Sequence, residues 1–419
     1  MSNIDIDVLP RTIADAITAT HSLGLRYLWT DTLCIIQDSS EDKGREISQM
    51  CDIYQRAYVT IIASCAKKAG DGFLHDRKNP VSTKLPFWLP TREMGTIHVR
   101  EQERAPRNEP ISQRAWCFQE RLLASRALIY ASHTLQFQCR RGINNVGGGN
   151  NFLVDGKREE VQIPTKTSNI EERKTWLEWK KVLAEYTRRS VTNSADKLVA
   201  LSGVAQAFQR AWMNEPDYLC GLWRTSMAQD LLWCRSSASA RTNHPGEYRA
   251  PSWSWAATDG AIADGGWPAG RISPLIFIQH CSITPKIPDF PFAEIERGEI
   301  QIEAIVRSVS WATTKSNSDD SPLYEMVGGE QKEIGFMYHD FIGGEATEGF
   351  GVVIGEHNKK VLHNLIGILV VPSKKLQGVY VRVGFFNVHA RIVDEGWEDE
   401  PFADIENWID TPRQLITIV

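Results

Sequence analysis

The amino-acid sequence predicts an α/β protein in three parts. These are an incomplete α/β layer over residues 1–140, a loop and helical connector over 141–244, and an antiparallel β-rich module over 245–419. In the first part, stretches of helical and strand periodicity alternate in short succession, which is typical of a parallel α/β layer. After about Tyr248, apolar or alternating runs are separated by Gly, Pro and Asn, which indicates a β-rich module. A chain of 419 residues is long enough for two or three domains, each with its own core.

The composition excludes several classes of protein. The net charge is −5, so the chain has no basic surface for nucleic acid and we expect no nucleic-acid partner. No stretch approaches the roughly 18 apolar residues that a membrane helix needs. The first residues, "MSNIDIDVLPRT", are acidic and polar, unlike a signal peptide. The eight cysteines are scattered, with no C-x-x-C pair, which favours reduced thiols in the cytoplasm over disulfides or a zinc site.

The elements of the first part follow from local patterns. "RTIADAITATHSLG" predicts a helix that follows Pro10 and ends at Gly24, a residue type common at helix ends. "RYLWTDTLCII" comes next, and "WTDTLCIIQD" (29–38) reads as a buried strand with polar residues set into it. Apolar residues recur at helical spacing between residues 40 and 56, and "AYVTIIASC" predicts a second buried strand.

The following segments continue the alternation of predicted helices and strands, and the last part of the chain predicts strands. "RAWCFQERLLASRALIY" predicts a helix that leads into a strand, and "SHTLQFQC" predicts another strand. "GINNVGGGNNFLVDGKREE" is predicted to be an exposed loop, because it is rich in Gly and Asn. Helical patterns span residues 170–212 and 215–233. In the last part, "IEAIVRSVSWA", "LIGILVV" and "VYVRVGFFNV" predict strands.

Common catalytic motifs are absent from the sequence. It contains no G-x-x-x-x-G-K-[ST], no H-E-x-x-H and no G-x-S-x-G. "GGGNNF" lacks the flanking strand and helix of a dinucleotide-binding loop. Since no His, Cys or Asp residues show metal-ligand spacing, we expect neither a metal nor a cofactor.

Several blocks, in order, resemble a known family. "LPRTIADAITATHSLGLRYLWTDTLCIIQDS" and "EISQMCDIYQRAYVTIIAS" resemble the core of the fungal heterokaryon-incompatibility (HET) domain. "RAWCFQERLLASRALIY" resembles the next HET block, and "DKLVALSGVA", "YLCGLW" and "APSWSWA" look like the region that commonly follows the domain. The resemblance covers residues 9–140 well and 195–260 loosely.

The resemblance carries one departure. HET domains usually begin with a strand like Y-x-A-L-S-Y-x-W-G, and this block does not precede "LPRT" here, so the chain resembles an N-terminally truncated member. The family has been likened to TIR domains, in which the first strand and loop help to form the nucleotide pocket and some members cleave NAD. On that comparison we expect no measurable NAD hydrolysis.

Three acids are candidates for a site. Asp31 and Glu46 stand in the HET-like blocks, and the likeness to TIR glycohydrolases, which depend on one glutamate, makes Glu46 an alternative catalytic residue together with Asp31. The structural alternative for Asp31 is to cap backbone amides or to pair with an arginine, since buried carboxylates need partners. Glu120 has the same ambiguity: its role is either to pair with an arginine or to face a cleft.

Aromatic residues suggest a binding surface. The chain has fourteen tryptophans, and "APSWSWA" places Trp253 and Trp255 at strand period. With Trp116, these rings are predicted to line an apolar pocket between the two halves, while Arg114, Gln119 or a protonated Glu120 donates to a carbonyl of the substrate. The alternative is that all three tryptophans belong to the core.

Two functions follow as hypotheses. The first is a HET-like protein recruited to fungal secondary metabolism, which binds a small hydrophobic terpenoid or polyketide and promotes a cofactor-independent cyclisation such as a Diels–Alder ring closure. The alternative, implied by the resemblance, is a heterokaryon-incompatibility effector of cell death, with a TIR-like NAD hydrolase activity. A binding protein without activity is a third possibility.

Overall fold

The structure is a computed structural model in which the chain separates into two compact units, residues 1–162 and 163–419. The structure describes residues 4–76, 82–100, 109–146, 161–164, 172–212, 218–236, 246–263, 272–288, 290–312, 320–341, 346–359, 362–391 and 404–419. The chain combines helices with strands and has a large, mainly antiparallel sheet in its C-terminal part, so the α/β fold class is confirmed.

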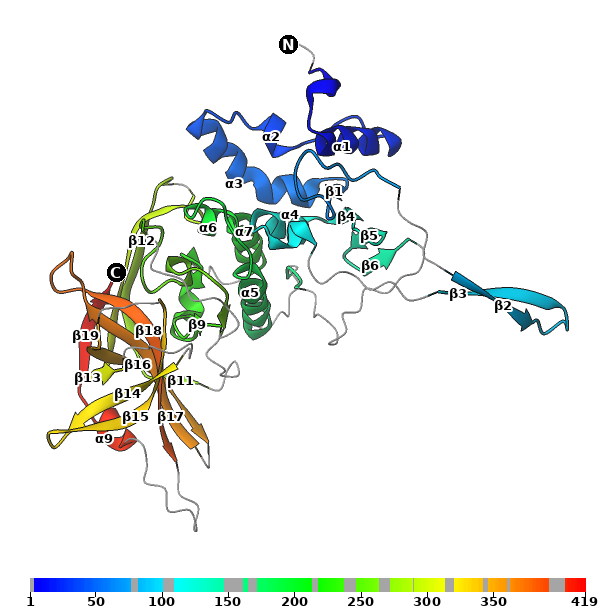
Figure 1. Cartoon of the computed structure of the whole chain (residues 1–419). Helices are drawn as coiled ribbons and strands as arrows, with labels where there is room; N and C mark the ends of the chain where they lie inside the picture. The colour runs from blue at the N-terminus through cyan, green and yellow to red at the C-terminus, as the bar shows by residue number, and fades with distance from the viewer. Residues whose placement is uncertain are drawn as a thin grey trace. The chain divides into compact units, whose positions relative to one another are not determined.

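The first unit combines helices with a small sheet (Figure 1). Its helices are the 3-10 helices η1 (Ile6–Val8) and η2 (Pro110–Gln113) and the α-helices α1 (Arg11–Ser22), α2 (Asp31–Cys34), α3 (Ser40–Arg56) and α4 (Trp116–Leu123). Its strands are β1 (Thr60–Ile62), β2 (Ser82–Trp88), β3 (Met94–Arg100), β4 (Arg126–Tyr130), β5 (Leu135–Cys139) and β6 (Gly142–Asn145). The sheet has the order β1-β4-β5-β6, in which β1 and β4 are parallel and the other pairs are antiparallel.

Several predicted elements of this unit are confirmed. Helix α1 begins after Pro10, and Gly24 lies just beyond its end with a φ of +72°, a conformation that glycine adopts freely. The predicted helix at residues 40–56 is α3, and the predicted helix and strand at residues 114–130 are α4 and β4. The start of the predicted glycine-rich loop is instead strand β6, and residues 147–160 lie outside the described residues.

The prediction of a buried strand at residues 29–38 is wrong. The segment holds the single-turn helix α2, and Leu33 and Ile36 are exposed. Acidic side chains supply acceptors for two of its backbone amides: Asp31 Oδ1 accepts from the amide of Thr32 at 2.8 Å, and Asp42 Oδ2 accepts from the amide of Ile36 at 2.8 Å. Such local bonds to acidic side chains compete with a sheet ladder, which explains why the segment is not a strand.

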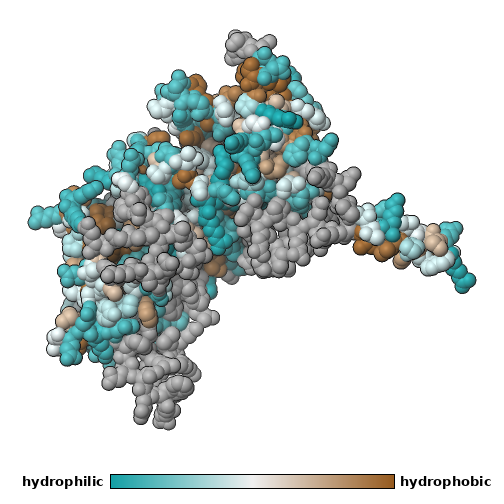
Figure 2. Space-filling view, in the orientation of Figure 1, coloured by the Kyte–Doolittle hydropathy of each residue, from teal (hydrophilic) through white to brown (hydrophobic). Residues whose placement is uncertain are grey.

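A second, two-stranded sheet in this unit leaves an apolar face exposed. Strands β2 and β3 form a hairpin whose partners are Leu85 with Ile97 and Thr83 with Val99. The apolar members of these pairs are exposed, and Figure 2 shows brown side chains on this hairpin. An isolated hairpin of this kind has little stability of its own.

The second unit contains helices, short hairpins and a large sheet. Its helical elements are α5 (Glu172–Tyr186), α6 (Asp196–Val199), α7 (Ser202–Ala211), η3 (Arg224–Ser226), α8 (Met227–Asp230), η4 (Trp255–Ala257) and α9 (Ile405–Ile409). Its short strands are β7 (Tyr218–Leu219), β8 (Leu222–Trp223), β9 (Cys234–Arg235), β10 (Ile262–Ala263) and β11 (Ser273–Pro274). Its long strands are β12 (Phe277–Pro285), β13 (Ile295–Trp311), β14 (Asp320–Val327), β15 (Glu330–His339), β16 (Glu348–Lys359), β17 (Leu362–Pro372), β18 (Tyr380–Arg391) and β19 (Arg413–Ile418).

The helical prediction for this unit is partly wrong. Helices α5, α6 and α7 fall within the predicted helical stretch, but the predicted helix at 215–233 is a β7–β8 hairpin followed by η3 and α8. The hairpin turns through Cys220 and Gly221, both at positive φ, a backbone conformation that a helix cannot accommodate. "APSWSWA" was predicted as a strand, and Trp255 instead begins the 3-10 helix η4, whose first turn Ser254 caps.

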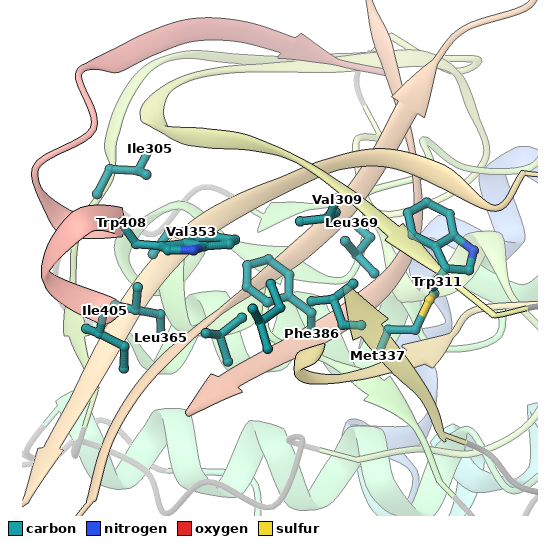
Figure 3. Close-up of a cluster of buried hydrophobic side chains, with 13 residues drawn as sticks. Ile305, Val309, Trp311, Met337, Val353, Leu365, Leu369, Phe386, Ile405 and Trp408 are labelled. Atoms are coloured by element: carbon teal, nitrogen blue, oxygen red, sulfur yellow. The ribbon is translucent and has the colours of Figure 1, made fainter. Parts of the chain in front are cut away.

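Six of the long strands form a closed ring. Along the sheet β13, β14, β15, β18, β17 and β16 pair in succession, and β16 pairs again with β13. Apolar side chains from these strands fill its interior, and Ile405 and Trp408 from α9 join them (Figure 3). The predicted C-terminal β module is therefore an antiparallel barrel with a packed core.

Candidate functional site

The candidate site lies where α3 packs on α4 in the first unit. Gln119 on α4 is fully buried, and its side-chain amide donates to Met50 Sδ at 3.8 Å. At the end of α4, Ser125 Oγ donates to the carbonyl of Gln55 at 2.8 Å. These contacts fix the two helices against each other and set the position of the next residue on α4, Glu120.

Among the described carboxyl groups of the first unit, the Glu120 carboxyl has the most strongly shifted pKa. Burial and the nearby negative charge of Asp31 raise the pKa of the Glu120 carboxyl to about 7. The charge of Arg114 and a hydrogen bond with the Cys117 thiol oppose this rise without cancelling it. The side chain is still partly exposed, so solvent reaches it. Near neutral pH the carboxyl therefore exists in both forms and can donate or accept a proton.

A tyrosine completes the group. Burial, and then the charges of Glu120 and Asp31, raise the pKa of the Tyr54 hydroxyl well above its ordinary value, so it stays protonated. The Tyr54 ring contacts Trp29 edge-on, with ring centroids 5.8 Å apart. The site thus combines two carboxyls, a phenol and an indole from three separate segments of the chain.

Asp31 sits on the exposed side of this group. Its Oδ1 also accepts from the Thr32 hydroxyl at 3.2 Å, so the carboxylate bonds both the amide and the hydroxyl of the next residue in the first turn of α2. Asp31 thus holds one backbone amide, and its charge still reaches Glu120 and Tyr54. Asp31 thus holds a local turn and acts electrostatically on the site.

Glu46 differs in its contacts from the other predicted site residues. It lies on α3 two turns before Tyr54, and its Oε1 is 3.6 Å from Arg45 Nε. Its charge is not among the influences that raise the pKa of Glu120 or Tyr54. Of the predicted residues, the structure brings together Asp31, Arg114, Gln119 and Glu120 and does not place Glu46 electrostatically with them.

Three members of the site were missed from the sequence: Trp29, Tyr54 and Cys117. Tyr54 falls eight residues after Glu46 and four after Met50. That spacing puts all three on one face of α3. The helical spacing in α3 predicted only that this face packs in the core. The approach of Glu120 to Tyr54 depends on tertiary packing, which the spacing does not contain.

The predicted tryptophans lie in different units. Trp116 begins α4 in the first unit and is partly exposed. Trp253 and Trp255 are fully buried in the second unit, where Trp255 Nε1 donates to the carbonyl of Gly221 at 3.1 Å. The ring of Trp255 packs on Tyr186, with centroids 6.0 Å apart. Their contacts are those of core residues, and substrate binding by these rings stays a prediction.

Two further findings concern metal ligands and membrane helices. Within the described ranges, no three His, Cys, Asp or Glu side chains are arranged to hold a metal ion. No helix in the described part of the chain is long and apolar enough to cross a membrane.

Comparison with known proteins identifies the first unit. Residues 1–120 match the family described as Heterokaryon incompatibility protein (HET). The N-terminal part of the chain carries a HET domain. The family resemblance drawn from the sequence is thus confirmed, and the candidate site falls within the matched residues. No curated protein and no solved structure matches the chain.

Proposed function

We propose that the HET domain of this chain hydrolyses a glycosidic bond of a nucleotide such as NAD, and that this activity makes the protein an effector of heterokaryon incompatibility. The observation that carries the proposal is the Glu120 carboxyl, whose pKa burial and Asp31 raise to about 7. A carboxyl whose pKa lies near neutrality, beside a second carboxyl group, is a recurrent arrangement for acid–base catalysis.

The charge distribution suits this reaction. Glycosidic cleavage passes through a cationic, oxocarbenium-like sugar, which a nearby carboxylate stabilises. In NAD the C1′–N bond breaks with its electron pair moving to nitrogen, so nicotinamide leaves neutral and needs no proton. Asp31 then stabilises the ribosyl cation. Glu120 in its ionised form accepts the proton of the attacking water and later releases it to solvent, so that NAD⁺ and water give ADP-ribose, nicotinamide and H⁺.

The surrounding residues fit a nucleotide. Arg114 carries an exposed guanidinium close to Glu120, a group well suited to phosphate oxygens. Trp29 and Tyr54 supply aromatic surface beside the acids, of the kind on which a flat ring packs. The expectation of no NAD hydrolysis stays an untested prediction, and the acid pair supports the opposite outcome.

A direct assay decides the proposal. The purified chain is incubated with NAD, and nicotinamide and ADP-ribose are quantified by chromatography. Release is expected from the wild type, with a loss of at least about 100-fold in Glu120→Gln, in line with removal of a general base. Glu93→Gln, a substitution on the exposed β2–β3 hairpin, serves as the matched control and should retain full activity.

Further variants and a cell assay separate the alternatives. Asp31→Asn should lower the activity without abolishing it, whereas Asp7→Asn, an exposed control in η1, should keep the activity of the wild type. If Glu46→Gln abolishes release and Glu120→Gln does not, the alternative catalytic glutamate is correct and Glu120 is structural.

Expression of the wild type in a fungal host should reduce viability, and Glu120→Gln should restore it. Full viability with the wild type would contradict the effector role.

The cyclase is a second candidate, because a Glu120 carboxyl that is protonated near neutrality is also a hydrogen-bond donor for a substrate carbonyl. It requires the acid form of Glu120, whereas hydrolysis requires the ionised form. A terpenoid or polyketide cyclisation promoted by this chain would therefore slow as the pH rises through 7, opposite to NAD hydrolysis.

A further inference from the structure

Two buried cations in the second unit converge on the segment after η4. Lys197, from α6, donates from Nζ to the carbonyl of Thr258, and its Nζ lies 3.8 Å from Asp259 Oδ1. Arg249 donates from Nε to the carbonyl of Ala256 at 2.6 Å and from Nη2 to Asp259 Oδ1 at 2.6 Å. Both cations are more than nine-tenths buried, and they share this one carboxylate.

Within the described residues, more than one cation acts on Lys197. Burial, and then the charge of Arg249, lower the pKa of Lys197 to about 7; Asp259 opposes the shift and Arg235 adds to it. Asp196 lies nearby and acts on Tyr186, whose hydroxyl donates to the Lys197 carbonyl. Holding the Lys197 and Arg249 cations around one carboxylate in a buried position is unfavourable, so a further negative charge would be stabilised beside them.

Arg249 also has an unused donor. Its Nη1 is buried and has no hydrogen-bond acceptor among the described residues. A guanidinium carries five N–H groups, and leaving one buried without an acceptor is unfavourable by about 1–3 kcal/mol. The Asp259 side chain beside it is 43% exposed, so solvent reaches the edge of the cluster at this residue.

We propose that this cluster is a binding site for a tetrahedral oxyanion of the sulfate or phosphate class, held by Arg249 Nη1 and Lys197 Nζ and admitted at Asp259. Such an anion accepts several hydrogen bonds at once and supplies the missing charge. The Trp255 ring, 5.8 Å from Lys197 Nζ, keeps the amine in position. The site lies outside the HET domain and is independent of the proposed hydrolysis.

Calorimetry with sulfate tests the proposal on the intact chain. Sulfate keeps its charge across neutral pH, and concentrations up to about 5 mM with chloride-matched ionic strength avoid its general salting effect. Binding is expected to raise the proton affinity of Lys197. At pH 7, where this amine is about half charged, sulfate should therefore bind with uptake of up to about half a proton, measured in buffers of different ionisation enthalpy. The affinity should weaken as the pH rises above 7.

Variants assign the effect to the named groups. Arg249→Gln should abolish binding and Lys197→Met should remove the proton uptake, whereas Arg188→Gln, which removes an exposed ion pair with Glu185 just beyond the end of α5, should change neither. Asp259→Asn should tighten binding, because it removes the competing carboxylate; unchanged or weaker binding would contradict the assigned site.

The remaining outcomes are decisive without any variant. Absence of sulfate binding, or binding without proton uptake in the wild type, would overturn the proposal even if Arg249→Gln fails to fold. Parallel titrations with inorganic phosphate and AMP distinguish a free anion from the phosphate of a nucleotide. Binding of inorganic phosphate or of AMP supports the oxyanion class and shows whether the anion is free or part of a nucleotide.

Discussion

Asp31 and Glu120 come from distant segments of the HET domain, and the negative charge of Asp31 acts on Glu120. Together with burial, it holds the pKa of the Glu120 carboxyl at about 7, against the opposing charge of Arg114. The residue that accepts from the Thr32 amide in the first turn of α2 thus also raises the pKa of an acid on α4. This relationship leads to predictions about stability, about pH dependence and about the local structure of each unit.

Removal of the Glu120 charge should stabilise the first unit at alkaline pH. A carboxyl whose pKa is raised in the folded state binds protons more tightly there, so stability falls as the pH rises from about 4.5 to about 7 and stays reduced above. Glu120→Gln should therefore increase the free energy of unfolding on the order of 2 kcal/mol at pH 8 and leave it nearly unchanged at pH 4. Denaturant unfolding at the two pH values measures this, and an equal effect at both would disagree with a raised pKa.

The sign of the pH dependence distinguishes the two candidate reactions. Hydrolysis uses the Glu120 carboxylate as a base, so kcat/KM for NAD should rise with pH and level off above about 7. The inflection should move to lower pH in Asp31→Asn, because one of the charges that raise this pKa is gone. A rate that falls through the same range would favour the protonated donor of a cyclase.

Asp42 should be needed for the structure of the segment at 29–38. Its buried carboxylate accepts from the amide of Ile36 and pairs with Arg45. Asp42→Ala leaves that amide without its acceptor, which should weaken the segment by about 1–2 kcal/mol. Faster hydrogen exchange in residues 31–38 is the expected result. Glu41→Ala, an exposed substitution in the same helical turn, is the control and should exchange like the wild type.

Gly221 should not tolerate a side chain. A Cβ at this position would lie 2.3 Å from Trp255 Nε1, and its φ is +95°. Gly221→Ala is therefore expected to destabilise the second unit by at least about 2 kcal/mol. Thermal unfolding measures the loss, and Gly246→Ala, where a Cβ would meet nothing within 4 Å, should unfold like the wild type. Equal stability of the two variants would argue against the close packing of Trp255.

The sequence predicted those elements of the fold whose structure follows from the local spacing of apolar residues. The alternation in β13 and the helical spacing in α3 and α4 reflect surfaces that are buried in their own unit, so the periodicity was informative. The structure of the segment at 29–38 was not predicted, because Asp31 and Asp42 accept hydrogen bonds from backbone amides that would otherwise bond to a neighbouring strand. The closure of the barrel by the pairing of β13 with β16 depends on contacts distant in sequence, which no local pattern contains.

The candidate site was predicted in part for the same reason. Asp31, Arg114, Gln119 and Glu120 stand in short blocks that can be read locally, but their approach to Tyr54 depends on the packing of α3 against α4. The raised pKa of Glu120 arises from that packing and from Asp31, so it could not be predicted from the sequence alone. Trp253 and Trp255 were read as one face of a strand, and the 3-10 turn that begins at Trp255 removes that periodicity.

The central claim is that Glu120 is a near-neutral acid tuned by Asp31, and its pKa can be measured directly. Carbon-13 NMR of the Glu120 side-chain carboxyl, followed across pH 3–9 and assigned with Glu120→Gln, measures the protonation of this group. The predicted result is a midpoint at about 7 in the wild type and a lower midpoint in Asp31→Asn. A midpoint near the ordinary value of glutamate, unchanged by Asp31→Asn, would contradict the account.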